Sequence, residues 1–222
     1  MPILEKMTDF FAARVQGYDA HMLQNVQGCR EGYLEMAKQL PENTESLLDL
    51  GCGTGLELDE IFKRFPALRV TGIDLTSEML RELHRKHGDK ALTLICEDYF
   101  TADFTGAPFD AAVSFESLHH FTKEMKQALY KKVYDALKPN GVYMECDYMA
   151  RDDEEEASLL AECARLRQEQ GLSADEFYHF DTPCTAENQK ILLNGAGFAH
   201  VEEIFRIGGT VLLVARKQAQ NA

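Results

Sequence analysis

The chain has 222 residues, of which 45% are hydrophobic, and its formal net charge at neutral pH is −14. This length and composition fit one α/β domain with a helical cap and a full hydrophobic core. The acidic balance argues against a nucleic-acid partner, because affinity for phosphates depends on Lys and Arg. No apolar run reaches the 18 residues of a membrane span, and we expect a cytoplasmic protein without a signal peptide whose six cysteines are reduced thiols.

Residues 1–45 precede the first predicted strand. Apolar side chains recur there at near-helical spacing from Val26 to Leu40, and Pro41 ends the pattern. We expect a helical N-terminal cap over 1–45.

The segment from Leu47 to Leu56 reads LLDLGCGTGL and predicts a strand, a tight glycine turn and a helix. Gly51 and Gly53 have no Cβ atom, so the backbone can take positive φ and approach a ligand closely, while the free N–H groups of the helix point into the same crevice. Cys52 lies between these glycines, where a small packing residue and a reactive thiol are the two interpretations.

Two acidic residues indicate which ligand the turn binds. Gly55 follows Gly53 by two residues, whereas in the dinucleotide fingerprint the third glycine follows the second by three residues. Asp49 stands before the turn, an unfavourable place for a pyrophosphate but a suitable one for an amino group. Asp74 ends the next apolar run, where a carboxylate can accept hydrogen bonds from two ribose hydroxyls. The pattern favours a nucleoside whose other end is an amino acid.

From residue 47 onward, predicted strands and helices alternate. The strands are 47–50, 69–73, 92–96, 110–115 and 141–147, and the helices are 55–65, 76–87 and 123–137. Such alternation implies right-handed βαβ units and a mainly parallel sheet.

The C-terminal part begins with an insertion at 152–178, whose acidic start complements a helix dipole. A helix at 188–194 follows, and strands at 201–207 and 211–215 form a hairpin. We therefore expect an α/β, Rossmann-like fold with a seven-stranded, mostly parallel sheet, an antiparallel C-terminal hairpin, a helical N-terminal cap and a helical insertion after the fifth strand. The predicted core spans 46–217, and 218–222 form a tail.

Five motifs resemble those of the class I S-adenosylmethionine-dependent methyltransferases in order and spacing. They are DLGCGTG at 49–55, GIDLTSEML at 72–80, CED at 96–98, FDAAVSFESLHHF at 109–121 and LKPNGVYMECDY at 137–148. The resemblance covers about three quarters of the chain. It implies an enzyme whose cofactor is S-adenosylmethionine.

The resemblance also places the cofactor site. The candidate cofactor-binding residues are Tyr18, Asp49, Gly51, Cys52, Gly53, Asp74, Leu75, Met79, Asp98, Tyr99 and Phe115. Asp98 would accept the adenine amino group, with Tyr99 near the ring, and the segment around Tyr18 would fold over the cofactor. Packing is the alternative role for Tyr18 and Met79, and a solvated loop position is the alternative for Asp98.

The acceptor side is predicted from the later strands. His119 is the candidate catalytic residue, because an imidazole titrates near neutral pH and can orient an acceptor or take its proton. The alternative is that one residue of the pair His119 and His120 packs and the other is solvated. We expect the pair to begin a helix and point in different directions, and we predict no metal site. Asp147 and Tyr148 end a strand beside the pocket, and the insertion at 152–178 would cover it.

The predicted function is methyl transfer from S-adenosylmethionine to a small-molecule acceptor by in-line displacement. One alternative is an enzyme that modifies the cofactor itself. Another is a non-catalytic S-adenosylmethionine-binding regulatory protein. The acceptor, the methylated atom and the oligomeric state remain open.

Overall fold

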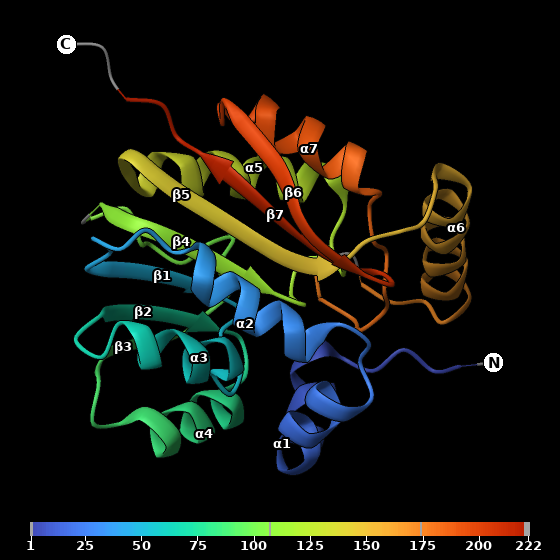
Figure 1. Cartoon of the computed structure of the whole chain (residues 1–222). Coiled ribbons are helices and arrows are strands. Elements are labelled where there is room, and N and C mark those ends of the chain that lie inside the picture. The colour runs from blue at the N-terminus through green and yellow to red at the C-terminus, as the bar shows by residue number, and fades with distance from the viewer. Residues whose placement is uncertain (1, 107, 174, 220–222) are drawn as a thin grey trace.

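Seven strands form one mixed sheet in the computed structural model, which describes residues 2–106, 108–173 and 175–219 (Figure 1). The strands are β1 (Ser46–Leu50), β2 (Arg69–Asp74), β3 (Ala91–Cys96), β4 (Phe109–Phe115), β5 (Leu137–Tyr148), β6 (His200–Ile207) and β7 (Thr210–Arg216). The helices are α1 (Met7–Gln24), α2 (Cys29–Gln39), α3 (Leu56–Arg64), α4 (Ser77–His87), α5 (Lys123–Ala136), α6 (Asp153–Glu169) and α7 (Ala186–Gly195).

The strand order is β3-β2-β1-β4-β5-β7-β6. Strands β1 to β5 pair in parallel, and β7 pairs antiparallel with both β5 and β6. This confirms the predicted Rossmann-like sheet and its C-terminal hairpin. The strand order reverses between β1 and β4, and open α/β sheets bind ligands beyond the carboxyl ends of the strands at such a point.

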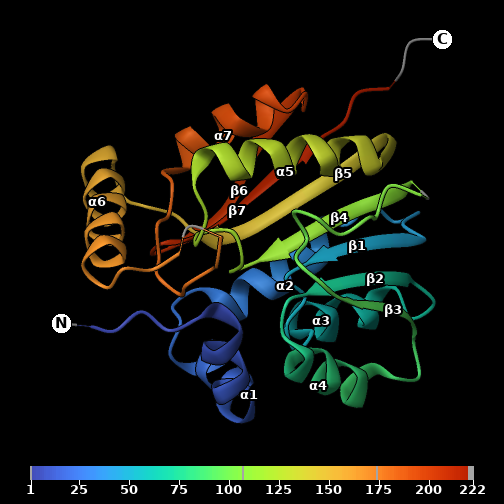
Figure 2. The same cartoon turned by 180° about the vertical axis from the view of Figure 1, so that it is seen from behind.

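The strand residues bury both faces of the sheet in alternation. In β7, Val211 and Leu213 belong to the cluster that α5 and α7 cover, while Leu212 and Val214 belong to the cluster beneath α2, α3 and α4. These helices lie on opposite sides of the sheet when Figures 1 and 2 are compared. A two-layer core of this kind holds the strand ends in fixed positions.

The structure corrects the start of β5. The strand was predicted over 141–147 but begins at Leu137, directly after α5. Its pairing with β4 shifts register, because Phe109 pairs with Leu137 and Ala111 pairs with Val142. The extra residues form a bulge in which Asn140 has φ of 64°.

The predicted cap region contains α1 and α2. Helix α2 contacts α3, β5 and β7, and α1 contacts α4. In both views α6 lies beyond the end of β5 and apart from the sheet (Figures 1 and 2). Among the described residues, no helix combines the length and the apolar character that a membrane span requires. Of the predicted tail, residues 220–222 lie outside the described residues.

Candidate functional site

Two cavities adjoin at the carboxyl ends of the strands. The first spans about 590 Å³ of space free of protein atoms and the second about 1550 Å³, and both are partly open to solvent. Phe11, Tyr18, Glu116 and His120 line both cavities, so a ligand in one would adjoin a ligand in the other. The first cavity lies against the glycine turn, and the second lies between α1 and the residues after β4 and β5.

The glycine turn forms one wall of the first cavity. Gly51 has φ of 70°, and a Cβ atom there would lie 2.0 Å from Oγ of Ser117. The backbone N–H groups of Gly51 and Cys52 both donate to the carbonyl oxygen of Ile73, at 2.8 and 3.2 Å. The turn is therefore fixed to β2, and only glycine fits at position 51.

Asp74 lines the first cavity from the end of β2. Its Oδ2 accepts a hydrogen bond from the Gly53 N–H at 2.9 Å, and its Oδ1 accepts one from the Thr76 N–H at 2.7 Å. Burial raises its pKa to about 6, while the two N–H groups act in the opposite direction. The carboxylate is oriented by the backbone, and its remaining lone pairs are available to a ligand.

Asp49 is fully buried and does not line either cavity. Among the described residues no N–H or hydroxyl group donates to its carboxylate oxygens, and its one polar neighbour at hydrogen-bond distance is the carboxyl group of Glu57. Burial raises its pKa well above the usual range, and the neighbouring Glu57 and Asp74 raise it further. A cationic group of a ligand near the turn would offset the repulsion among the carboxylates of Asp49, Glu57 and Asp74.

The structure sorts the candidate cofactor-binding residues into two groups. Those that line the first cavity are Tyr18, Gly51, Gly53, Asp74, Leu75, Met79, Asp98 and Tyr99. Cys52 lies outside both cavities, and its Sγ would be 2.8 Å from a Cβ atom at Gly72, so it packs on β2. The ring of Phe115 stacks on Tyr33 at 3.8 Å and is likewise part of the core.

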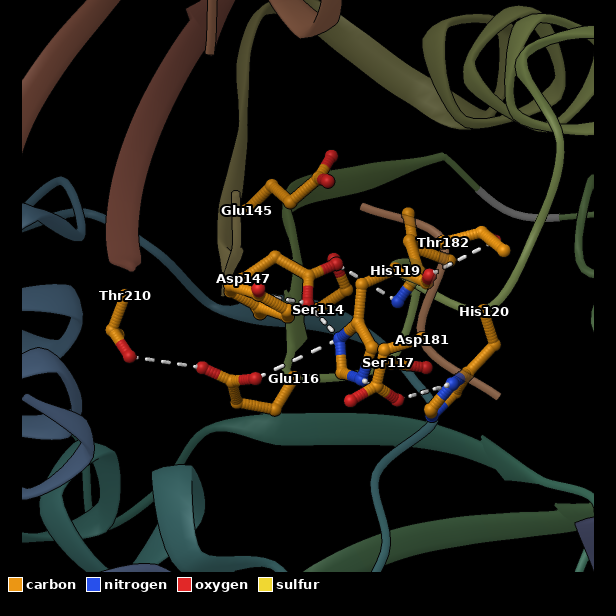
Figure 3. Close-up of polar contacts among 12 residues, drawn as sticks. Ser114, Glu116, Ser117, His119, His120, Glu145, Asp147, Asp181, Thr182 and Thr210 are labelled. Carbon is orange, nitrogen blue, oxygen red and sulfur yellow. Dashed lines mark hydrogen bonds and ion pairs between the residues drawn. The ribbon is translucent and has the colours of Figure 1, made fainter. Parts of the chain in front are cut away.

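His119 lies between three carboxylates (Figure 3). Its Nδ1 donates to Oδ1 of Asp147 at 2.5 Å and lies 3.6 Å from Oε2 of Glu116, while its Nε2 is 3.5 Å from Oδ1 of Asp181. Burial acts to lower the pKa of His119, but Asp147, Glu116 and Asp181 outweigh this and raise it to about 9. Asp147 thus fixes which nitrogen of the ring faces the second cavity.

The secondary structure at the histidine pair differs from the prediction. His119 and His120 do not begin a helix; they lie in the turn before α5, which starts at Lys123. Their ring centroids are 4.0 Å apart, and their side chains are only 8% and 3% exposed, so neither is solvated. A turn lets adjacent side chains face the same space, which a helix does not.

Glu116 has a strained backbone in the shared wall. Its φ of 45° is in the left-handed region although it is not glycine. Its Oε1 accepts a hydrogen bond from Oγ1 of Thr210 at 3.2 Å, and burial raises its pKa to about 7. Strained residues of this kind concentrate at functional sites.

The sequence did not predict every residue of the site. Phe177, which lines the first cavity, lies in the insertion that was predicted to cover the pocket, but His179 and Asp181, which line the second, were missed. Helix α6 contributes no residue to the described lining of either cavity. No local motif or periodicity marks the segment after α6, and only folding brings it against the histidine pair.

Comparisons with known proteins show which family the chain resembles. A family model described as a methyltransferase domain matches residues 47–141. Carboxy-S-adenosyl-L-methionine synthase of Wolinella succinogenes is 30% identical over 197 residues, which cover 80% of this chain and 78% of that protein. Phosphoethanolamine N-methyltransferase of Plasmodium falciparum is 28% identical over 151 residues, which cover 68% of this chain and 56% of that enzyme.

A solved complex of DhpI with SAH shares the fold, with a TM-score of 0.70 and 18% identity over 96% of both chains. The fold defines a Rossmann-like α/β enzyme, and one of its two cavities lies against the glycine turn. The chain belongs to the class I S-adenosylmethionine-dependent methyltransferase family. Its cofactor is S-adenosylmethionine.

Proposed function

We propose that the enzyme transfers a methyl group from S-adenosylmethionine in the first cavity to a small-molecule acceptor in the second. The observation that carries this proposal is the wall shared by the two cavities, to which Phe11, Tyr18, Glu116 and His120 contribute. The cofactor supplies a methyl group on a sulfonium with a neutral leaving group. In such a displacement the protein contributes chiefly alignment, which can be worth about 7 to 11 kcal/mol.

The cofactor residues fit this role by their chemistry. Asp74 has oriented lone pairs for the ribose hydroxyls. Asp98 would accept the adenine amino group beside the buried ring of Tyr99. The carboxylate of Asp49, to which no N–H or hydroxyl group of the described residues donates, and the close approach at Gly51 suit a ligand that carries a positive charge near the turn.

On the acceptor side, His119 would orient the acceptor through Nε2. With its pKa raised to about 9 the ring is a hydrogen-bond donor at neutral pH, and it would take the acceptor's proton in its neutral form. Asp147 holds the ring by Nδ1, and its other oxygen accepts the Leu118 N–H at 2.9 Å. This is the arrangement of a base and the group that orients it. Tyr148 lines the same cavity and would contribute to the acceptor surface.

Helix α1 would close the site from water. Its aromatic side chains Phe10, Phe11 and Tyr18 line the second cavity. The helix is held down by Asp19, which accepts a hydrogen bond from Oγ1 of Thr54 at 2.5 Å and pairs with Lys86 at 3.1 Å. The division into a cap at 1–45, a core at 46–217 and a tail at 218–222 is part of this proposal. The insertion was predicted to cover the acceptor over 152–178, but we now assign this role to the segment with His179 and Asp181, which lines the second cavity.

A second candidate is modification of the cofactor itself, which the carboxy-S-adenosyl-L-methionine synthases among the relatives favour. A carboxylated reactant would need a cation. Among the described residues that line the second cavity, Arg14 is the one permanent cation, and it already pairs with Glu5 at 2.9 Å. Glu116 and Asp181 line the same cavity, so its charge favours a neutral or cationic acceptor.

The test is calorimetric titration with S-adenosylmethionine and with NAD, followed by mass spectrometry of turnovers with a panel of small amines, phenols and acids. Binding of S-adenosylmethionine alone, with S-adenosylhomocysteine formed only when an acceptor is present, supports methyl transfer. A carboxylated cofactor as product would support the second candidate instead. Binding of NAD in place of S-adenosylmethionine would overturn both.

A further inference from the structure

His119, His120 and Asp181 face one another at the wall of the second cavity (Figure 3). One ligand atom from each lies within 4.8 Å of the other two. We propose that these three side chains bind a divalent transition-metal ion.

The distances fit a shared ion. Oδ1 of Asp181 lies 3.5 Å from Nε2 of His119 and 3.3 Å from Nδ1 of His120. Bonds of about 2.0 to 2.2 Å to a tetrahedral metal place neighbouring ligand atoms about 3.4 Å apart. The same Oδ1 is buried and has no hydrogen bond of acceptable geometry among the described residues. Two ring nitrogens and an unpartnered oxygen therefore surround a position that a cation would satisfy.

The surrounding contacts hold the ligands in place. Asp147 accepts a hydrogen bond from Nδ1 of His119, and this leaves Nε2 of the ring free toward Asp181. The N–H of Thr182, next to Asp181, donates to the carbonyl oxygen of His119 at 2.7 Å. A carboxylate behind a metal-binding histidine is the usual way to fix its tautomer and orientation.

A neighbouring set of three, Glu116, His119 and Asp147, also brings its ligand atoms together. In that set His119 would have to bind through Nδ1, which already donates to Asp147. The set with His120 and Asp181 uses the free Nε2 of His119. Its other imidazole, Nδ1 of His120, would exchange only the long 3.3 Å contact with the Phe180 carbonyl oxygen, so this set is the better site.

Two imidazoles and one carboxylate suit zinc, cobalt or iron, and three protein ligands leave coordination positions open. Because the ligands line the second cavity, those positions are available to an acceptor oxygen or nitrogen. This last step rests on the proposed function, whereas the metal site itself does not. A bound ion would replace the proton on Nε2 of His119 and would take over activation of the acceptor.

The test uses tag-free protein stripped with a chelator and desalted. Co²⁺ is titrated with detection of its visible absorption bands, and Zn²⁺ is titrated by calorimetry. We expect one saturable equivalent of either ion. Asp181→Asn and His120→Gln should each lose more affinity than the roughly 10- to 100-fold expected for Asp147→Asn, which removes only the orienting group.

His179→Gln is the matched control. His179 lines the same cavity, but its ring stacks on Phe10 at 3.5 Å and it is not one of the three ligands, so its loss should leave the affinity for Co²⁺ unchanged. Thermal unfolding of each stripped variant shows whether it is folded. The absence of stoichiometric binding in the wild type, or equal affinity in the folded Asp181→Asn and His120→Gln variants, overturns the site; in that case His120 donates to the carbonyl oxygen of Phe180, 3.3 Å away.

Binding of S-adenosylmethionine to the stripped protein is measured in parallel. If the cofactor binds and the metal does not, only the metal site fails. If the metal binds and the cofactor does not, the proposed function fails while the site stands.

Discussion

Asp147 accepts a hydrogen bond from Nδ1 of His119 at 2.5 Å, and both side chains are buried. The second oxygen of Asp147 accepts the Leu118 N–H, so one carboxylate fixes both the ring and the backbone that carries it. The nitrogen that remains faces the second cavity, and this relationship determines what chemistry the histidine can perform.

Asp147→Asn should lower kcat without changing the affinity for S-adenosylmethionine. The amide removes the charge and leaves one acceptor oxygen for two donors, His119 Nδ1 and the Leu118 N–H, so the ring loses its fixed orientation. Loss of a positioned acid–base group costs on the order of 10²- to 10⁴-fold in rate. Steady-state kinetics and calorimetry check this. Asp135→Asn, on the exposed side of α5, serves as control. A variant with unchanged kcat would remove His119 and Asp147 from the reaction.

Asp74→Ala should weaken binding of S-adenosylmethionine by about 2 to 3 kcal/mol, which is the cost of losing hydrogen bonds to a charged group. The fold should remain intact, because Asp74 bonds only to neighbouring N–H groups of the turn. Calorimetric titration measures the effect against Asp89→Ala, an exposed carboxylate. An affinity equal to that of the wild type would contradict the ribose assignment.

Gly51→Ala should abolish cofactor binding and lower stability by about 1 to 3 kcal/mol. The new Cβ would meet Ser117 at 2.0 Å, and its backbone would have to keep φ at 70°. Gly17→Ala is the opposite case, since nothing lies within 4 Å of its Cβ position in α1. That variant should gain up to about 1 kcal/mol, because alanine favours a helix interior. Urea unfolding measures the change in the free energy of unfolding of both variants.

The free protein should lose stability as the pH rises from about 5 to 8. Burial, followed by the charge of Asp147, raises the pKa of Glu145 to about 7. The folded state therefore retains a proton that the unfolded chain releases, so the stabilisation is complete below pH 4.5 and is lost as the pH passes through 7. At about 1.4 kcal/mol per pKa unit, the loss is on the order of 3 to 4 kcal/mol.

Glu145→Gln tests this assignment. Tyr130 donates to Oε2 of Glu145 at 2.8 Å and Tyr143 at 3.2 Å, and a neutral amide oxygen can accept the same bonds. Melting temperatures measured across this pH range should fall less steeply in the variant than in the wild type. Parallel curves would assign the pH dependence to other buried carboxyls, such as Glu57 and Glu116, whose pKa values are also raised to about 7.

The sequence by itself determined the sheet and the glycine turn, and it predicted eight of the residues that line the first cavity. These features are local: the turn, Asp74 and Asp98 each follow directly on a predicted strand, and parallel strands bring their carboxyl ends to one edge. Cys52 and Phe115 have the same motif positions, but their side chains point into the core. Side-chain direction at a strand end depends on packing that no motif records.

Only the tertiary structure decided the second cavity. It is assembled from α1, from the turn after β4 and from the segment after α6, so that Asp181 meets His120 across 61 positions of sequence. The histidine pair itself looked like the start of a helix, whereas the structure places it in a turn where both rings face Asp181. Contacts between distant segments depend on how the layers pack, and for this reason the acceptor side could not be derived from spacing along the chain.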